Sequence, residues 1–416
     1  MFFFYQIILT LALPLSPFII LLRILKNKED KKRFTEKFSI SSKIRRHGKL
    51  IWFHGASVGE ILSIIPIIKN YEKKKSINQI LITSSTLSSS KVLEKYKFKK
   101  TIHQFYPIDH IYFTNKFLKY WRPNLAIFIE SEIWPCMYKN IYNYNIPLIL
   151  LNARLTKKTF NRWIKIKYFS KSIFNKVLIA YPQNIETKKF LKKINPQKIK
   201  MLGNLKFAQN NEEIQNKISD QLKLEFNKKK IWVASSTHKN EEIFCAQAHL
   251  EIKKRVKNLL TIIIPRHVHR VKDIILEIES LNLKTACHSN KPKNLTNIDI
   301  YIVDTFGETN KFHKIGSSVF LGGSIIKRGG QNPLEAARYG ARILHGPNTD
   351  NFKDIYKLLK SFKISKKINT PKELASLISF KKSKITGVKI KKIGKIILKK
   401  TIKEIDNLIN NEVKKT

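Results

Sequence analysis

Residues 318–335, SVFLGGSIIKRGGQNPLE, are the stretch that says most about the fold of this chain. The opening SVFL segment is short and apolar, as in a strand buried within a parallel sheet. Gly329 and Gly330 form a small-residue turn, and Pro333 suits the first turn of a helix, where its missing N–H costs nothing. Glu335 is expected one turn into that helix. The stretch therefore predicts a strand–turn–helix unit whose turn can approach an anionic ligand.

The same alternation of apolar strands and amphipathic helical stretches runs through the chain up to residue 387, and it is typical of α/β domains with parallel sheets. The polar, helix-prone segment 208–229 contains no candidate strand and separates two such series. The candidate strands are 50–54, 80–84, 102–106, 125–129, 148–151 and 177–181 in the first series, and 231–235, 260–265, 300–304, 318–321 and 342–345 in the second.

This pattern predicts a domain at 26–207, a linker at 208–229 and a second domain at 230–387. The tail at 388–416 has the pattern of a basic amphipathic helix, and we expect it to pack back towards the first domain.

The N-terminal segment predicts a membrane anchor at 1–25. Residues 1–22 carry no charge and are rich in Phe, Ile and Leu, about the length of a membrane-spanning helix, although Pro14 and Pro17 would kink it. Basic residues follow directly, which places the rest of the chain on the cytoplasmic side. The segment lacks the basic start and small-residue cleavage site of a signal peptide, so we expect an uncleaved anchor.

The formal net charge of +50 raises the question of an anionic partner. The excess is mostly lysine spread from end to end, without an arginine-rich helix or an RNP-like motif. This distribution is typical of compositional drift and favours an anionic membrane surface over nucleic acid. The 3 cysteines are far apart and show no CxxC spacing, so they indicate neither a zinc site nor a disulfide framework.

Polar clusters follow several predicted strands, and parallel strands bring such clusters to one edge of a sheet. Together with the anchor, they closely resemble, in collinear order, the bacterial 3-deoxy-D-manno-octulosonic acid (Kdo) transferases. The matching segments are 52–60 (WFHGASVGE), 130–135 (ESEIWP), 152–155 (NARL), 203–207 (GNLKF), 234–238 (ASSTH), 265–267 (PRH), 304–308 (DTFGE) and 329–335 (GGQNPLE).

The resemblance implies a GT-B glycosyltransferase, with two Rossmann-like domains facing a central cleft and the acceptor domain first. It implies inverting transfer of Kdo from CMP-Kdo to the lipid A precursor (lipid IVA) in lipopolysaccharide biosynthesis, with release of CMP. The enzyme would act on the cytoplasmic face of the bacterial inner membrane. Position 331 departs from the family, whose members often carry His where this chain has Gln331, and only His titrates near neutral pH.

Inverting transfer needs a base for the acceptor hydroxyl, and the resemblance assigns this role to Glu60. From its position alone, Glu60 could instead be a first-turn residue that complements a helix dipole. Ser57 and Gly59 belong to the same turn. Glu130 and Glu132 follow another strand: one could bind the acceptor or orient Glu60, and the other could pair with a lysine. We select Glu130 as the site residue.

The leaving CMP gathers negative charge, which must be stabilised. No DxD motif is present, so we expect a reaction without metal or cofactor, in which cations and backbone N–H groups hold the phosphate. Glu335 would accept hydrogen bonds from ribose. The predicted donor-binding residues are Lys206, Ser236, Thr237, His238, Arg266, His267, Gly329, Gly330, Gln331, Asn332 and Glu335.

Two other interpretations stay open at this point. One keeps the fold and changes the chemistry, to another GT-B transferase or a nucleotide-sugar epimerase. The other is a membrane-tethered basic binding protein without catalysis, which leaves the strand-end carboxylates and the glycine turns unexplained.

Overall fold

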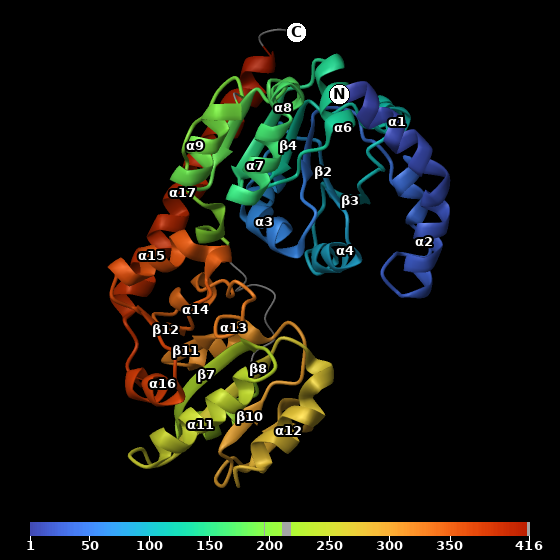
Figure 1. Ribbon diagram of the computed structural model, residues 1–416. Coiled ribbons are helices and arrows are strands. Elements are labelled where there is room, and N and C mark those ends of the chain that lie inside the picture. Colours follow the sequence, from blue (N-terminus) through green and yellow to red (C-terminus); the bar gives the residue numbers. More distant parts are fainter. Residues whose placement is uncertain (195, 210–217, 414–416) are drawn as a thin grey trace. The chain divides into compact units, whose positions relative to one another are not determined.

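The computed structural model describes residues 1–194, 196–209 and 218–413, and the chain divides into two compact units (Figure 1). The first unit is Met1–Gln209 with Gly394–Thr416, and the second is Asn210–Ile393. Each unit contains one parallel β-sheet with helices on its faces. The α/β class with two parallel sheets is thereby confirmed. The chain first leaves the first unit after Gln209, close to the boundary predicted at residue 207.

The sheet of the first unit has six strands in the order β3-β2-β1-β4-β5-β6. From β1 the chain winds outward through β2 and β3, and then returns to the other side of β1 for β4. Such a reversal is the topological switch point at which open α/β sheets bind ligands, beyond the carboxyl ends of the two strands. The strands are β1 (Leu50–His54), β2 (Gln79–Ser84), β3 (Thr101–Phe105), β4 (Leu125–Ile129), β5 (Leu148–Ala153) and β6 (Ile179–Pro182).

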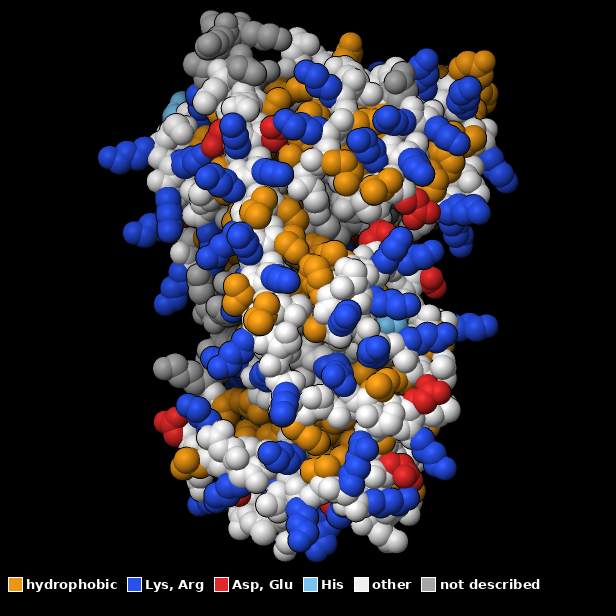
Figure 2. Space-filling view, turned by 90° about the vertical axis from the view of Figure 1, so that its left-hand side faces the viewer, with side chains coloured by type: hydrophobic (Ala, Val, Ile, Leu, Met, Phe, Trp, Pro, Cys, Tyr) orange, Lys and Arg blue, Asp and Glu red, His pale blue; other side chains and the backbone are white. Residues whose placement is uncertain are grey.

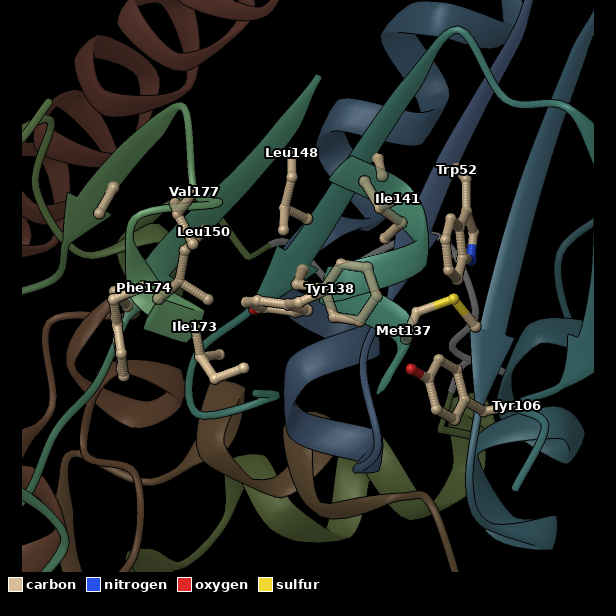
Figure 3. Close-up of a cluster of buried hydrophobic side chains, with 14 of the residues drawn as sticks. Trp52, Tyr106, Met137, Tyr138, Ile141, Leu148, Leu150, Ile173, Phe174 and Val177 are labelled. Carbon is tan, nitrogen blue, oxygen red and sulfur yellow. The ribbon is translucent and has the colours of Figure 1, made fainter. Parts of the chain in front are cut away.

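Helices connect these parallel strands, since a parallel pair needs a crossover. The connecting helices are α3 (Val58–Glu72), α4 (Leu87–Glu94), α5 (Ile111–Trp121), α6 (Pro135–Asn143), α7 (Lys157–Lys165) and α8 (Lys167–Phe174), and α9 (Ile185–Ile194) follows the last strand, β6. Figure 3 shows part of the core, where Trp52 and Leu150 of the sheet belong to one buried cluster with Met137 and Tyr138 of α6. This packing fixes the start of α6 close to the ends of β1 and β4.

The sheet of the second unit has seven strands in the order β13-β12-β11-β7-β8-β10-β9, so its switch point lies between β7 and β11. Its strands are β7 (Lys230–Thr237), β8 (Leu259–Pro265), β9 (Thr285–Cys287), β10 (Ile300–Ile302), β11 (Ser318–Leu321), β12 (Arg342–His345) and β13 (Ser365–Lys367). Its helices are α10 (Asp220–Asn227), α11 (Glu241–Lys253), α12 (Val271–Glu279), α13 (Thr309–Ile315), α14 (Leu334–Ala337), α15 (Lys353–Ser361) and α16 (Pro371–Leu377).

The two ends of the chain both contact the first unit. Phe2–Leu25, formed by α1 (Phe2–Ala12), a short 3-10 turn and α2 (Ser16–Leu25), is long and apolar enough to cross a membrane. The last helix, α17 (Lys384–Val413), starts in the second unit and belongs to the first from Gly394 onward. Its Asp406 accepts a hydrogen bond from Tyr71 at 2.8 Å and pairs with Lys74. α17 therefore packs on the first unit, where the predicted tail at 388–416 was expected.

Candidate active site

Glu60 lies at the switch point of the first sheet, in the first turn of α3. Ser57 caps this helix by accepting a hydrogen bond from the Glu60 N–H at 3.3 Å. The carboxylate of Glu60 in turn accepts from the Ser57 hydroxyl at 2.9 Å and from the Ala56 N–H at 2.8 Å. This arrangement is a variant of the capping box that a Ser three residues before a Glu favours, because the Glu60 carboxylate accepts from the Ala56 N–H rather than from the N–H of the N-cap residue Ser57. It holds both carboxylate oxygens of Glu60 in one orientation.

The surroundings of Glu60 raise its pKa to about 7. Burial is the largest cause, and the negative charges of Glu132 and Glu130 add to it. The hydrogen bonds from Ser57 and Ala56 act in the opposite direction, because they stabilise the carboxylate. A carboxylate with a pKa near neutrality is well matched to accept a proton from an attacking hydroxyl.

Glu132 is held at the end of β4 by two aromatic side chains. Its Oε2 atom lies 3.1 Å from Nε2 of His54 and accepts a hydrogen bond from Nε1 of Trp134 at 2.9 Å. His54 is fully buried and stacks on Tyr106, with 3.8 Å between the ring centroids. Burial lowers the pKa of His54, so its ring is neutral near pH 7. Neighbouring Glu130 has different partners.

Glu130 forms an ion pair with Lys206. Nζ of Lys206 lies 2.6 Å from Oε1 of Glu130, and both side chains are largely buried. The backbone of Glu130 is left-handed, with a φ of 54°, which is uncommon outside glycine and is often found at functional sites. Asn152 at the end of β5 accepts a hydrogen bond from the Leu205 N–H at 3.0 Å and so positions the segment that carries Lys206.

The structure thus brings five of the predicted residues together in the first unit, around the ends of β1 and β4. They are Ser57, Gly59, Glu60, Glu130 and Lys206. The prediction that Lys206 binds donor phosphate stays a prediction, and the structure adds that its charge is already shared with Glu130. Glu132 was considered from the sequence but not selected. Its partner His54 lies 78 residues away in the chain, so no local signal identified the contact.

In the second unit, the buried carboxylate of Glu241 organises the switch point. It accepts hydrogen bonds from the backbone N–H groups of His238 at 3.0 Å and Gly323 at 2.7 Å. It also accepts from Ser324 and Ile325, at 3.1 and 3.0 Å. Glu241 therefore ties the loop after β7 to the loop after β11. It was not predicted as a site residue, although it lies only three residues after the matching segment at 234–238.

The glycine turn after β11 differs in part from the expectation. Gly329 and Gly330 have φ values of 81° and 73°, which confirms the predicted use of glycine. However, the Gly330 N–H donates to the Gly323 carbonyl at 2.8 Å, so it is not available to a phosphate in this structure. The expected helix is also short: α14 has four residues, with Pro333 at its N-cap and Glu335 as its second residue. Gly340, with a φ of 76°, ends the turn that follows.

A helix of one turn has only a small dipole. The prediction that the start of this helix binds phosphate stays a prediction. The side chain of Asn332 is also engaged, because its Oδ1 accepts from the Leu334 N–H at 3.1 Å. The backbone carbonyl of Gln331 accepts from the Tyr356 hydroxyl at 3.1 Å.

Positive charge gathers beyond the ends of β7 and β8. Burial and the charges of His267 and Arg328 lower the pKa of His238, and those of Arg266 and Arg270 add to the effect. Arg266 is exposed, and none of the residues that the structure describes accepts a hydrogen bond from its guanidinium. Burial raises the pKa of Glu335, while the charges of Arg338 and Arg266 oppose that rise. These groups form a cationic surface suited to an anionic donor.

The remaining donor-side predictions lie on the same loops. Ser236 has a left-handed φ of 56°, and Thr237 is buried beside it. A Cβ at Gly322 would lie 2.3 Å from the Ser236 carbonyl, so the loops after β7 and β11 meet closely. Within the described ranges, no group of three or more His, Cys, Asp or Glu side chains could hold a metal ion.

Comparisons with known proteins relate this arrangement to one family. Residues 32–209 match the model described as 3-Deoxy-D-manno-octulosonic-acid transferase (kdotransferase). The 3-deoxy-D-manno-octulosonic acid transferase of Rickettsia bellii is 35% identical over 383 residues, which cover 90% of each chain.

Two solved structures share the fold. The glycosyltransferase of Rickettsia africae has a TM-score of 0.54 and 11% identity, over 88% of this chain and 100% of its own. The UDP-GlcNAc 2-epimerase of Neisseria meningitidis has a TM-score of 0.52 and 13% identity, over 85% and 100%. At such identities the likeness shows a GT-B-like fold and leaves the activity to the sequence relatives. On the strength of those relatives, the chain belongs to the family of 3-deoxy-D-manno-octulosonic acid transferases, which are glycosyltransferases.

Proposed function

We propose that this chain transfers Kdo from CMP-Kdo to a hydroxyl of the lipid A precursor, with Glu60 as the catalytic base. The observation that carries the proposal is the Glu60 carboxylate itself. It is fixed at the sheet's switch point by Ser57 and Ala56 and has a pKa of about 7. A glutamate that only caps a helix would usually be ionised well below neutrality.

In the proposed step, the acceptor oxygen attacks C2 of Kdo while its proton passes to the carboxylate of Glu60. The bond between C2 and the phosphate oxygen breaks, and its electron pair leaves with CMP. Attack opposite the leaving group inverts the configuration at C2. The cationic surface around Arg266 and His238 would stabilise the charge on the leaving phosphate. No metal or cofactor takes part in this proposal.

Membrane attachment is part of the proposal, because the lipid acceptor lies in a bilayer. Phe3, Phe4, Ile8 and Leu11 of α1 are each more than 60% exposed, as expected for side chains that enter lipid. The Tyr5 hydroxyl donates to Asp109 at 2.9 Å, and Arg23 pairs with Glu29 at 2.6 Å. The start of the anchor is thus held by a contact with the body of the first unit, and its end by a local ion pair. We infer that it lies along the cytoplasmic face of the inner membrane, rather than crossing a core of about 30 Å.

The test is a reaction of purified full-length protein with CMP-Kdo and a tetraacyl lipid A precursor, with products weighed by mass spectrometry. We expect the acceptor mass to rise by one or more Kdo residues and CMP to be released, with unchanged rates after a chelator. UDP- and GDP-sugars serve as matched donors that should give no product. Transfer from one of those donors, with none from CMP-Kdo, would contradict the proposal.

A further inference from the structure

The two carboxylates that follow β4 differ in the charge of their partners. Glu130 pairs with the cation Lys206 at 2.6 Å. Glu132 instead receives N–H groups from two neutral rings, those of His54 and Trp134. An ion pair offsets the charge of a carboxylate towards its neighbours, whereas neutral donors orient a carboxylate and leave its charge in place. Glu132 is therefore the stronger source of uncompensated negative charge near Glu60.

The buried ring of His54 lies within hydrogen-bond distance of Thr83 on one side and of Glu132 on the other. Nε1 of Trp52 can only donate, and it donates to the Thr83 hydroxyl oxygen at 2.9 Å. The Thr83 hydroxyl oxygen also lies 2.9 Å from Nδ1 of His54, and the Thr83 carbonyl oxygen lies 3.3 Å from the same nitrogen. Nε2 of His54 faces Glu132 at 3.1 Å, and because an ionised carboxylate can only accept, a ring hydrogen on Nε2 satisfies this contact. The rings of His54 and Trp134 thus hold the Glu132 side chain in one orientation.

Several segments around Glu60 and the two carboxylates carry groups whose charge can be stated. The α3 turn offers only neutral donors, from Ser57 and Ala56. The end of β1 carries His54, which is neutral, and the segment after β4 carries Glu130 and Glu132. Two cations lie beside Glu130: Lys206 pairs with its carboxylate, and Arg154, after β5, donates its backbone N–H to the Glu130 carbonyl at 3.2 Å. Consistent with this balance, the charge of Glu132 raises the pKa of Glu60 more than that of Glu130 does.

We propose that Glu132 is a positioning residue, held in one orientation by His54 and Trp134, whose negative charge makes Glu60 a stronger base for the acceptor proton. The inference rests on the proposed role of Glu60. It assigns Glu132 no contact with substrate, and it separates the two carboxylates that the sequence alone left equivalent.

The first experiment compares the pH dependence of kcat/KM in the full-length wild type, Glu132→Gln and Glu132→Asp. A glutamine oxygen can still accept hydrogen bonds but carries no charge, so we expect the acid limb of Glu132→Gln to move down by about one pH unit. Glu132→Asp keeps the charge and should retain the wild-type limb, even if its rate is lower. If kcat/KM fell at the same acidic pH in all three proteins, the proposal would be overturned.

The second experiment does not require activity. Because the pKa of Glu60 is raised from 4.5 to about 7, the folded state binds this proton more tightly than the unfolded state does. The resulting stability is present below 4.5 and is lost as the pH rises through about 7. At about pH 8 we therefore expect Glu132→Gln to raise Tm more in the wild type than in a Glu60→Gln background. At about pH 5, where Glu60 is protonated, we expect Glu132→Gln to change Tm by nearly the same amount in both backgrounds.

The two experiments separate failure of this inference from failure of the proposed function. Full activity in Glu60→Gln would remove Glu60 as the base, yet the thermal comparison would still report its coupling to Glu132. Equal Tm changes in both backgrounds at both pH values would remove the coupling, even if Glu60 remained essential.

Discussion

Glu60 shows how one residue can serve both folding and chemistry. Its backbone and side chain complete the capping box of α3, which by itself would stabilise the ionised form. Burial and the charges of Glu132 and Glu130 work against that form and dominate, since the resulting pKa is about 7. Such opposition between local hydrogen bonding and environment is typical of catalytic carboxylates.

The first residue-level prediction concerns removal of this carboxylate. Glu60→Gln keeps the shape and the acceptor oxygen but cannot take a proton, so kcat should fall by at least ~10². Binding of CMP-Kdo, measured by calorimetry, should be unchanged, because the predicted donor-binding residues other than Lys206 lie in the other unit, and Lys206 pairs with Glu130. Ser57→Ala is the matched control: it loosens the same cap and should lower activity much less. Near-normal transfer by Glu60→Gln would contradict the assignment.

The second residue-level prediction is the pH dependence of the wild type. A base must be deprotonated to act, so kcat/KM should increase with pH up to about 7 and then level off. Below that value it should fall about tenfold for each pH unit. Steady-state rates measured across this pH range at constant ionic strength would give the acid limb of the kcat/KM profile. A rate that stays constant down to about pH 5 would mean that no group with the pKa of Glu60 limits the reaction.

At the level of elements, one buried carboxylate joins the anchor to the site. Asp109, between β3 and α5, accepts the Cys136 and Met137 N–H groups at the start of α6, at 3.1 and 2.9 Å. The same side chain accepts the Tyr5 hydroxyl of α1 at 2.9 Å. Because α6 begins directly after Trp134, the contact that docks the anchor also supports the segment carrying Glu132.

We expect Asp109→Ala to leave two buried N–H groups of α6 without an acceptor and to cost about 1–2 kcal/mol of stability. Tyr5→Phe removes the anchor's hydrogen bond alone and should cost less, about 0.5–1.5 kcal/mol. Urea unfolding of the full chain in detergent would measure both losses. If Tyr5→Phe destabilised as strongly as Asp109→Ala, the cap of α6 would not be the main role of Asp109.

At the level of the whole molecule, charge is the dominant feature. Figure 2 shows Lys and Arg side chains spread over one face, with few Asp and Glu among them. A lysine excess of this kind gives a long-range attraction to anionic lipid, and salt screens it. The apolar anchor gives a contact that depends on buried area rather than on charge.

A form starting at residue 26 separates these two contributions. We expect it to bind liposomes containing anionic lipid at low salt and to be released as salt rises, whereas the full chain should remain bound. Sedimentation with liposomes over a salt series would measure both, with neutral liposomes as the control. Salt-insensitive binding of the shortened form would mean that charge is not the force that attaches it.

Much of the fold could be read from the sequence where apolar runs are bounded by polar or small residues. Both β1 and β4 begin and end at the predicted residues, because strands buried on both faces are apolar throughout. The edge strands β9 and β13 were not predicted, because they have three residues each and carry polar side chains. The helix after the glycine turn was expected to be longer than its four residues, since Gly340 was not recognised as a stop.

Local sequence was enough to establish the family, the two α/β units and Glu60 in the first turn of α3, since these depend on residue type and spacing along the chain. The partners of the carboxylates came from folding alone. Glu130 meets Lys206, Glu132 meets His54, and Glu241 gathers the loop that starts at Gly323, all through contacts between distant segments. The charge around a buried group depends on which distant residues fold beside it. The spacing of residues along the chain does not predict those neighbours.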